Sequence, residues 1–315
     1  MVASLSGSEQ LKVWQADATD PRPRAHSGWP ELDGMLRRTS FGPGTLAFLA
    51  GRMHTRKTAV MVNLIINMLR ADVPVGLVGL DEAPFMYVSK LASAMTGESH
   101  VVLDDMWANY SPVSGYMDTM QDEYKKLTQK FSFTAPARPN LDDLADWVEM
   151  ESVLSERKRV IFIDYLSLLE RGKYDGKDSS RIPRLCEDLK MWANKHQMVV
   201  IALHQVGRTD DSAARRYHGS TPITPEQLMF GGEQQADIIM ATYRPSLDPE
   251  GSLSQEEAIS QGIAQADWQT KADRVSAFQQ DTMLQLIKNR PGVVLDTKGI
   301  RLRSVGMSQK MEVVV

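Results

Sequence analysis

Short apolar runs recur along this chain, and segments with helical periodicity separate most of them. One such segment starts at Lys57, another covers 141–156 and a third covers 181–197. Strands that are joined through helices pair in parallel and are covered on both faces. The pattern predicts a doubly wound α/β fold, with a mainly parallel central sheet flanked by helices. The expected strands are 45–50, 75–80, 131–134, 160–166, 199–203, 237–243 and 283–288.

The helix expected over 141–156 carries a start signal in its first residues. Asn140 stands at the N-cap position and Asp143 follows three residues later. Two such side chains satisfy backbone N–H groups that the first helical turn leaves free. Leu141, Leu144 and Val148 then place apolar side chains on one face.

Composition limits the class of protein. The chain has 315 residues, a net formal charge of −4 and one cysteine, Cys186. One cysteine excludes an internal disulfide and a cysteine-based zinc site, and the charge gives no overall attraction to nucleic acid. No basic and apolar leader is present, and no apolar run approaches the ~18 residues of a membrane span. We expect a soluble cytoplasmic protein, of a bacterium or a virus-infected host cell, with no membrane partner.

The chain is expected to have two parts. Residues 1–25 are polar and contain prolines, which indicates an arm or linker. Residues 26–315 are expected to form one domain. Within it, 245–280 is polar although it lies between two expected core strands, so we interpret it as a partly helical insertion.

The run over 45–50 leads through Gly51 and a short loop into an apolar helix, which is the setting of a phosphate-binding loop. In such a loop, backbone N–H groups hold phosphates, a lysine reaches the β and γ phosphates, and a hydroxyl ligates Mg²⁺. Lys57 and Thr58 stand at the positions of that lysine and that hydroxyl. The sequence therefore predicts a nucleotide site.

Arg56 departs from this motif, because the position before the lysine is normally a glycine. Glycine lets the backbone approach the phosphates with no Cβ in the way. Two interpretations remain open. The Arg56 guanidinium contacts a phosphate directly, or its bulk and a strained backbone prevent tight nucleotide binding.

Polar groups follow three further expected strands. Asp164 ends one of them, Asp81 and Glu82 follow another, and Gln205 follows a third. Ligands of open α/β sheets bind at the carboxyl ends of the strands. We expect Asp164 to hold Mg²⁺ with Thr58, one of Asp81 and Glu82 to orient the attacking water, and Gln205 to sense the γ phosphate.

Several segments, in order, resemble motifs of the RecA-type motor domain of DnaB-like replicative helicases. HSGWPELDGML resembles TGf-x-x-LD, AGRMHTRKTA resembles AGRPxxGKTA, and GLDEA falls where the family has SLEM. FIDYLSLL resembles IDYLQLM and IALHQVGR resembles ALSQLNR. FGGEQQADIIMATYRP resembles SGxIEQDADxxxxxYR, and LQLIKNRPG resembles the terminal KNRxG. The resemblance runs over nearly all of 26–305.

This resemblance implies a RecA-like phosphate-loop fold and a DNA helicase or DNA-dependent ATPase of replication or recombination. It implies a ring, expected to be a hexamer, that binds ATP and Mg²⁺, or Mn²⁺, between subunits and moves on single-stranded or forked DNA. By the same resemblance, Lys288 and Arg290 enter the nucleotide site of the neighbouring subunit. Arg52 lines the nucleotide pocket. The catalytic glutamate of the family is replaced by Asp81 in the simplest register, with Glu82 one position later.

In this family, the loops after the Asp164 and Gln205 strands face the channel of the ring. The corresponding loops here, 171–181 and 207–220, are rich in Gly, Ser and basic residues, as expected for contact with DNA phosphates. Tyr174 and Tyr217 are expected stacking partners for bases. The expected DNA-binding residues are Arg171, Lys173, Lys177, Arg208, Arg215 and Arg216.

Two other functions remain open at this stage. If Arg56 prevents ATP binding, Asp81, Glu82 and Asp164 are carboxylates that a divalent ion can use to cleave DNA, which would make the protein a structure-specific nuclease. Alternatively, the chain is a DNA-binding accessory protein that has kept the fold and lost turnover. Either function would leave Lys57 without a catalytic role.

Overall fold

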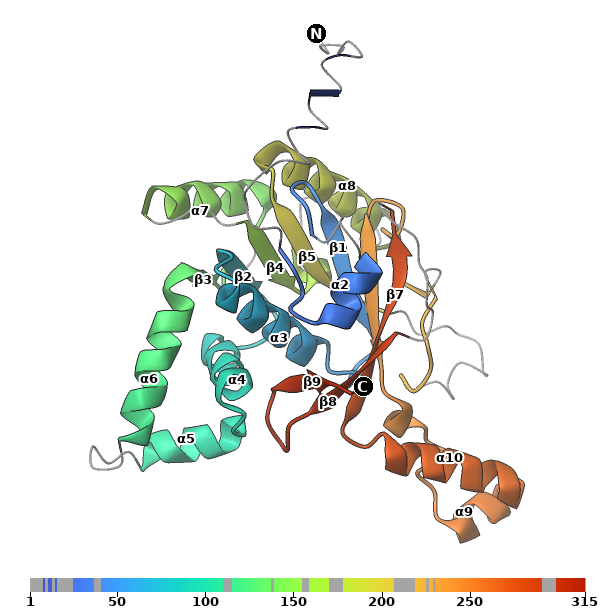
Figure 1. Cartoon of the computed structure of the whole chain (residues 1–315). Coiled ribbons are helices and arrows are strands. Elements are labelled where there is room, and N and C mark those ends of the chain that lie inside the picture. The colour runs from blue at the N-terminus through green and yellow to red at the C-terminus, as the bar shows by residue number, and fades with distance from the viewer. Residues whose placement is uncertain are drawn as a thin grey trace.

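A single central sheet organises the computed structural model of this chain. The structure describes residues 25–36, 41–109, 115–136, 139–154, 159–169, 178–206, 219–224, 227–228, 231–290 and 299–314, and isolated positions among the first 15. Within these ranges the sheet has nine strands in the order β3-β2-β4-β5-β1-β6-β7-β8-β9. Figure 1 shows the sheet running through the middle of the molecule with helices on both sides.

The first six strands of the sheet form a parallel unit. Their bounds are β1 Leu46–Gly51, β2 Val75–Gly79, β3 Phe131–Thr134, β4 Val160–Asp164, β5 Val199–Gln205 and β6 Ile238–Tyr243. The remaining strands, β7 Asp281–Asn289, β8 Ile300–Ser304 and β9 Met311–Val313, are antiparallel to their neighbours. The prediction of a mainly parallel sheet is confirmed for β1 to β6. It missed β8 and β9 and did not anticipate that β7 runs antiparallel.

Helices cover both faces of the sheet. Their bounds are α2 Pro30–Leu36, α3 Lys57–Arg70, α4 Pro84–Thr96, α5 His100–Ala108, α6 Tyr116–Leu127, α7 Leu141–Leu154, α8 Asp178–His196, α9 Gln255–Ser260 and α10 Gln265–Ala277. Alternate residues of β1 point to opposite faces. Ala47 and Leu49 pack with α2, α3 and α4, whereas Leu46 and Phe48 pack with α7 and α8. The core is therefore two apolar layers, one on each side of β1.

Two helical parts extend from this body (Figure 1). The first is formed by α5 and α6, which the sequence reasoning did not anticipate. The second is the pair α9 and α10, which occupies the predicted insertion at 245–280 and connects β6 to β7. α9 starts with a capping box in which Ser254 and Glu257 satisfy each other's backbone N–H groups. None of the helices in the described part of the chain has the length and apolar character needed to cross a bilayer.

The local start signal predicted for α7 is present. Asn140 Oδ1 accepts a hydrogen bond from the Asp143 N–H at 2.9 Å, and Asp143 Oδ2 accepts one from the Asn140 N–H at 2.9 Å. Leu144 and Val148 are each 1 % exposed, so the predicted apolar face of α7 is buried. Cys186, the one cysteine, is also fully buried, in α8.

The strand register brings the carboxyl ends of five strands together. Gly51 of β1 is level with Gln205 of β5 and with Thr242 of β6, and Gly79 of β2 is level with Asp164 of β4. Strand ends that are level in a parallel sheet deliver their loops to one edge. The predicted polar groups therefore meet at one edge of the sheet.

Candidate functional site

The connection from β1 to α3 is a tight loop that starts at Gly51. A Cβ at Gly51 would overlap Thr55 Oγ1 and Thr242 Oγ1, so glycine is required there by close packing. The Thr55 hydroxyl donates to the Arg52 carbonyl at 2.8 Å and lies 2.9 Å from Thr242 Oγ1. These contacts brace the loop from inside and leave the first N–H groups of α3 at the sheet edge.

Lys57 is the first residue of α3, and its side chain folds back over the loop. Its Nζ donates to the carbonyl oxygens of Gly51 at 2.9 Å and Arg52 at 2.8 Å. Burial lowers the Lys57 pKa to about 8, while Asp164 and Asp81 oppose that shift. The ammonium therefore sits at the mouth of the loop with two acidic groups facing it.

Thr58 and Asp164 come together from different elements. Thr58 Oγ1 lies 3.4 Å from Asp164 Oδ2, and Asp164 is 2 % exposed. Burial raises the Asp164 pKa to about 7, and the neighbouring Asp81 and Glu82 contribute to that rise. Because its surroundings disfavour the negative charge, the Asp164 carboxylate would be stabilised by a cation placed between it and Thr58.

Tyr87 of α4 supports Asp164, and the sequence reasoning missed it. The Tyr87 hydroxyl donates to Asp164 Oδ2 at 3.2 Å and accepts from the Glu82 N–H at 3.3 Å. Tyr87 is fully buried, and both burial and the charge of Asp164 raise its pKa, so the hydroxyl keeps its proton. A Pro-initiated helix directly after GLDEA was the only sequence signal that placed it near the site.

Asp81 and Glu82 follow β2 but have different surroundings. Glu82 forms an ion pair with Lys90 of α4, with Nζ 2.5 Å from Oε1 and from Oε2. Burial and the charge of Glu82 raise the pKa of Asp81, while Lys57 and Lys90 oppose the shift. Asp81 therefore shares the electrostatic environment of Lys57 and Asp164, whereas Glu82 is held by Lys90.

Gln205 ends β5 directly beside the loop. It is level with Gly51, and the next residue, Val206, donates its N–H to the Gly51 carbonyl at 3.3 Å. The preceding His204 is 4 % exposed and packs edge-on against Phe48, with ring centroids 5.1 Å apart. His204 thus belongs to the core, and Gln205 is the polar group that β5 presents at the site edge.

Arg56 has a left-handed backbone, with φ 63° and ψ 32°, at the N-cap of α3. Its Nη1 donates to the Gln280 carbonyl at 2.7 Å and to Ser304 Oγ. Burial lowers the Arg56 pKa, and the charge of Asp281 opposes this. The side chain is therefore held by the β7 and β8 segments, and the backbone has the left-handed conformation that the second interpretation drawn from the sequence invoked.

The conformational cost at Arg56 is offset by these contacts. A left-handed backbone costs a non-glycine residue about 1 to 2 kcal/mol. Hydrogen bonds that involve a charged group contribute about 1.5 to 3 kcal/mol each. Two such bonds are sufficient to hold Arg56 in the conformation that glycine adopts freely.

Arg244 makes a second connection between the loop and the β7 segment. Its Nη1 donates to the His54 carbonyl at 3.3 Å, and its Nη2 donates to the Gln279 carbonyl at 3.0 Å. Burial lowers the Arg244 pKa to about 10, and Arg56 adds to the shift. Arg52 is half-buried, and its carbonyl accepts the bonds from Thr55 and Lys57 described above.

Lys288 and Arg290 lie toward the amino ends of the parallel strands, away from the loop of their own chain, which follows the carboxyl end of β1. Lys288 is level with Ile239, which is level with Phe48 of β1. Phe48 precedes Gly51 by three residues, a separation of about 10 Å along a strand. The two cations are therefore not brought together with Lys57 within one subunit.

Backbone carbonyls and one carboxylate hold these two cations. Lys288 Nζ donates to the carbonyls of Glu233 at 2.5 Å and Gln234 at 3.3 Å. Arg290 Nη2 donates to the Gln234 carbonyl at 2.5 Å, and Nη1 lies 3.4 Å from Asp237 Oδ1. The Arg290 side chain is 52 % exposed, so it is accessible to another subunit.

The predicted DNA-binding residues lie outside the described part of the chain. These residues are Arg171, Lys173, Lys177, Arg208, Arg215 and Arg216. The two expected stacking partners, Tyr174 and Tyr217, also lie outside the described part. The described residues that flank them are well anchored. Arg181 donates to the Leu169 carbonyl at 3.0 Å and the Ser167 carbonyl at 2.9 Å. Gly219, with φ 90°, packs so closely on the Thr55 methyl group that a Cβ would overlap it.

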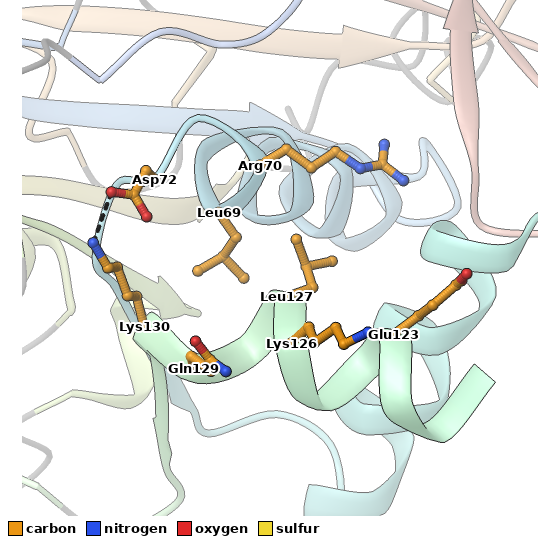
Figure 2. Close-up of a pocket in the computed structure, with 8 residues that line it drawn as sticks. All are labelled: Leu69, Arg70, Asp72, Glu123, Lys126, Leu127, Gln129 and Lys130. Atoms are coloured by element: carbon orange, nitrogen blue, oxygen red, sulfur yellow. Dashed lines mark hydrogen bonds and ion pairs between the residues drawn. The ribbon is translucent and has the colours of Figure 1, made fainter. Parts of the chain in front are cut away.

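A pocket of about 380 Å³ lies away from the phosphate loop. It is formed where the end of α3 meets the end of α6 and is lined by Leu69, Arg70, Asp72, Glu123, Lys126, Leu127, Gln129 and Lys130 (Figure 2). α3 starts at the loop and spans 14 residues, about 20 Å. This pocket is therefore separate from the edge where Lys57 and Asp164 meet.

The residues at the sheet edge fit a nucleotide-bound Mg²⁺ better than a metal held by protein alone. Among the described residues, no group of three or more His, Cys, Asp or Glu side chains is placed to hold a metal ion. Mg²⁺ usually takes one or two protein ligands together with substrate phosphates and water. Thr58 and Asp164, whose oxygens lie 3.4 Å apart beside the loop, match that smaller donor set.

A parallel sheet with a phosphate loop after β1, and a carboxylate at the end of β4, defines the RecA-like class of phosphate-loop proteins. Within that class, residues 25–303 match the DnaB-like helicase C-terminal domain family. This match covers most of the chain, and the protein belongs to that family. The resemblance seen in the sequence motifs is thereby confirmed.

Individual relatives agree with this assignment. The replicative DNA helicase DnaB of Helicobacter pylori is 25 % identical over 227 residues, which cover 69 % of this chain and 43 % of that protein. DnaB of Rickettsia prowazekii is 24 % identical over 269 residues, covering 79 % of this chain and 51 % of that protein. The chain therefore spans about half the length of these relatives.

Two solved structures have the same fold. One is an ATPase domain, which superimposes with a TM-score of 0.74 at 20 % identity and covers 98 % of this chain and 100 % of that one. The other is a DnaB-like replicative helicase, described with its interactions with primase. It gives a TM-score of 0.71 at 20 % identity, covering 98 % of this chain and 67 % of that one. At this identity the likeness establishes the fold alone.

Proposed function

We propose that this chain is the motor of a DnaB-like DNA helicase, which hydrolyses ATP with Mg²⁺ and moves on single-stranded or forked DNA. One observation carries the proposal: Lys57 lies at the mouth of a braced phosphate loop, beside the Thr58 and Asp164 pair. Membership of the DnaB-like family supports it. Arg56 does not oppose it, because its side chain is held against β7 and β8.

Each residue at the edge has a task in this proposal. Lys57 leaves the carbonyls of Gly51 and Arg52 and pairs with the β and γ phosphates, a stronger acceptor than two neutral carbonyls. Thr58 and Asp164 hold Mg²⁺, which offsets the charge of the phosphates. Gln205, level with Gly51, contacts the γ phosphate.

Asp81 is the group that orients and deprotonates the attacking water. Partial burial and the charge of Glu82 raise its pKa, which makes its carboxylate a better proton acceptor than an unperturbed aspartate. Glu82 is paired with Lys90, and its negative charge contributes to the raised pKa of Asp81.

Lys288 and Arg290 act on the nucleotide of a neighbouring subunit. They lie too far along the sheet to reach the loop of their own chain, and the Arg290 side chain is half exposed. A cation supplied from a neighbour stabilises charge that develops on the transferred phosphate. This arrangement requires a head-to-tail interface between subunits, and we propose that the assembly closes as a hexameric ring with a site at each interface.

DNA binding is assigned to 171–181 and 207–220. A backbone-directed contact suits a motor, because it must bind every sequence equally. Gly219, near the end of the second segment, packs against Thr55 of the phosphate loop, which gives a direct path from the DNA segment to the nucleotide site.

The nuclease alternative receives no support from the carboxylates at the edge. Asp81, Glu82 and Asp164 are all described, and they do not form a group able to hold a metal ion by themselves. Glu82 is also paired with Lys90. We therefore favour the motor over metal-dependent cleavage.

Phosphate release from ATP and Mg²⁺, with and without single-stranded DNA, tests this function. We expect release that DNA stimulates and that Lys57→Ala abolishes, while Lys125→Ala on the exposed face of α6 leaves it unchanged. DNA shortening in Mg²⁺ or Mn²⁺ without nucleotide would support the nuclease instead. DNA binding with no turnover, unchanged in Lys57→Ala, would support an accessory protein.

A further inference from the structure

Arg56 connects three segments that are distant in sequence. It is the N-cap residue of α3, its Nη1 donates to the Gln280 carbonyl directly before β7, and the same nitrogen donates to Ser304 Oγ at the end of β8. The Gln280 carbonyl also accepts the Ser304 N–H at 3.0 Å. One carbonyl thus joins the Arg56 side chain to the β7 and β8 pair.

The segment that receives Arg56 is itself firmly anchored. Asp281, the residue after Gln280, is fully buried and accepts hydrogen bonds from Arg301 and Arg303 of β8. Arg301 also lies over the Phe278 ring, 4.1 Å from its centroid. The acceptors of Arg56 therefore belong to a rigid part of the sheet edge.

Arg56 stands at the position that sets the backbone conformation of the loop. Residue 56 sets the backbone direction from which the Lys57 and Thr58 N–H groups follow, and its left-handed conformation is one that an arginine leaves when it is not held. Glycine would sample many conformations at this point. Fixing one conformation before a ligand arrives reduces the ordering cost of binding.

We propose that Arg56 is a positioning residue for the phosphate loop, and that its contacts with Gln280 and Ser304 form a latch that keeps the loop in the phosphate-binding conformation. This inference rests on the proposed function for its effect on nucleotide, but the latch itself is a property of the free protein. An arginine in place of the usual glycine then makes the free loop more ordered, and Arg56 does not contact the phosphates.

Substitution of Ser304 distinguishes two roles for Arg56, a latch and a direct phosphate ligand. It lies on β8 and touches the guanidinium, so removing its hydroxyl loosens the latch and frees Arg56 to move. A latch then predicts weaker nucleotide binding in Ser304→Ala. A phosphate ligand predicts unchanged or tighter binding, because a competing acceptor has been removed.

The first measurement is hydrogen exchange of the backbone amides in residues 52–58 of the free protein. We expect faster exchange in Arg56→Ala and in Ser304→Ala than in wild type, partial recovery in Arg56→Lys, and no change in Arg70→Ala, a matched exposed arginine at the far end of α3. Equal exchange in wild type, Arg56→Ala and Ser304→Ala would overturn the latch. Melting temperatures identify any variant that has lost its fold, and Ser304→Ala is the mildest of them.

The second measurement is titration with a fluorescent ATP analogue in Mg²⁺, followed by kcat and KM for ATP. We expect Arg56→Ala to weaken binding about tenfold and to raise KM more than it lowers kcat. Ser304→Ala should weaken binding less and add nothing in the Arg56→Ala background. Additive effects, or tighter binding in Ser304→Ala, would overturn the latch.

Failure of the proposed function has a different signature. If wild type and Lys57→Ala bind the analogue equally, the nucleotide site fails while the exchange measurement still decides the latch. If Lys57→Ala alone abolishes binding and both latch variants match wild type in exchange and affinity, the site stands and the latch fails.

Discussion

Lys90 Nζ lies 2.5 Å from both carboxylate oxygens of Glu82, so an ion pair holds one of the two acidic groups that follow β2, and this pairing is our reason for proposing Asp81 as the catalytic group. Of the two carboxylates, Asp81 is the one whose charge acts on Lys57, while both act on Asp164. The family motif alone left the two positions open, since either is one step from the usual glutamate.

Substitution separates the two carboxylates. Asp81→Asn should reduce kcat for ATP about a hundredfold or more, because an amide is not a general base. Glu82→Gln should retain most of the turnover, and Lys90→Ala should act like Glu82→Gln. Steady-state phosphate release checks this, and a larger loss in Glu82→Gln than in Asp81→Asn would reverse the assignment.

Tyr87→Phe tests the support of the magnesium ligand. The change keeps the buried ring and removes the hydroxyl that donates to Asp164 Oδ2. Loss of such an outer partner should raise the Mg²⁺ concentration for half-maximal turnover about tenfold. Tyr124→Phe, in α6, is the matched control. An unchanged Mg²⁺ requirement in Tyr87→Phe would show that the hydroxyl does not tune the site.

The buried Asp281 gives a prediction for stability and pH. Burial by itself raises a carboxyl pKa, but hydrogen bonds from Arg303 and Arg301 outweigh it and lower the pKa of Asp281 below its usual value. The stabilisation is thus present above the unfolded pKa of about 3.9 and is lost as pH falls through the lower folded value. Asp281→Asn should lower the free energy of unfolding by about 2 kcal/mol at neutral pH.

Urea denaturation at a series of pH values measures this contribution. The difference between wild type and Asp281→Asn should stay constant from neutral pH down to about pH 5 and shrink below about pH 4. Asp72→Asn, whose exposed carboxylate pairs with Lys130, should change stability little at any pH. A difference for Asp281→Asn that persists unchanged at the lowest pH would contradict the ion-pair explanation.

The parallel half of the sheet was predictable because most of its strands are short, mainly apolar runs. β1, β2, β4 and β6 are buried along their whole length, which gives a continuous hydrophobic pattern. β8 alternates instead: Ile300, Leu302 and Ser304 are buried while Arg303 is exposed. So short an alternation has no distinct signal, and the antiparallel edge was missed.

The same contrast holds for the site. The meeting of Lys57, Thr58, Asp164 and Gln205 at one edge was predictable because they stand at fixed offsets from strand ends, and the register places those ends side by side. The course of the Arg56 side chain was not predictable. Its acceptors, Gln280 and Ser304, are 224 and 248 residues away in sequence, and only the folded sheet brings them to the loop.

The central claim is a nucleotide site that Lys57 begins and the Arg290 of a neighbouring subunit completes. Mixing two inactive variants, Lys57→Ala and Arg290→Ala, tests it most directly by phosphate release in the presence of single-stranded DNA. Random mixing should place an intact loop opposite an intact arginine at about a quarter of the interfaces, so turnover should reappear. If wild type turns over ATP and the mixture stays as inactive as either variant alone, the shared site is contradicted.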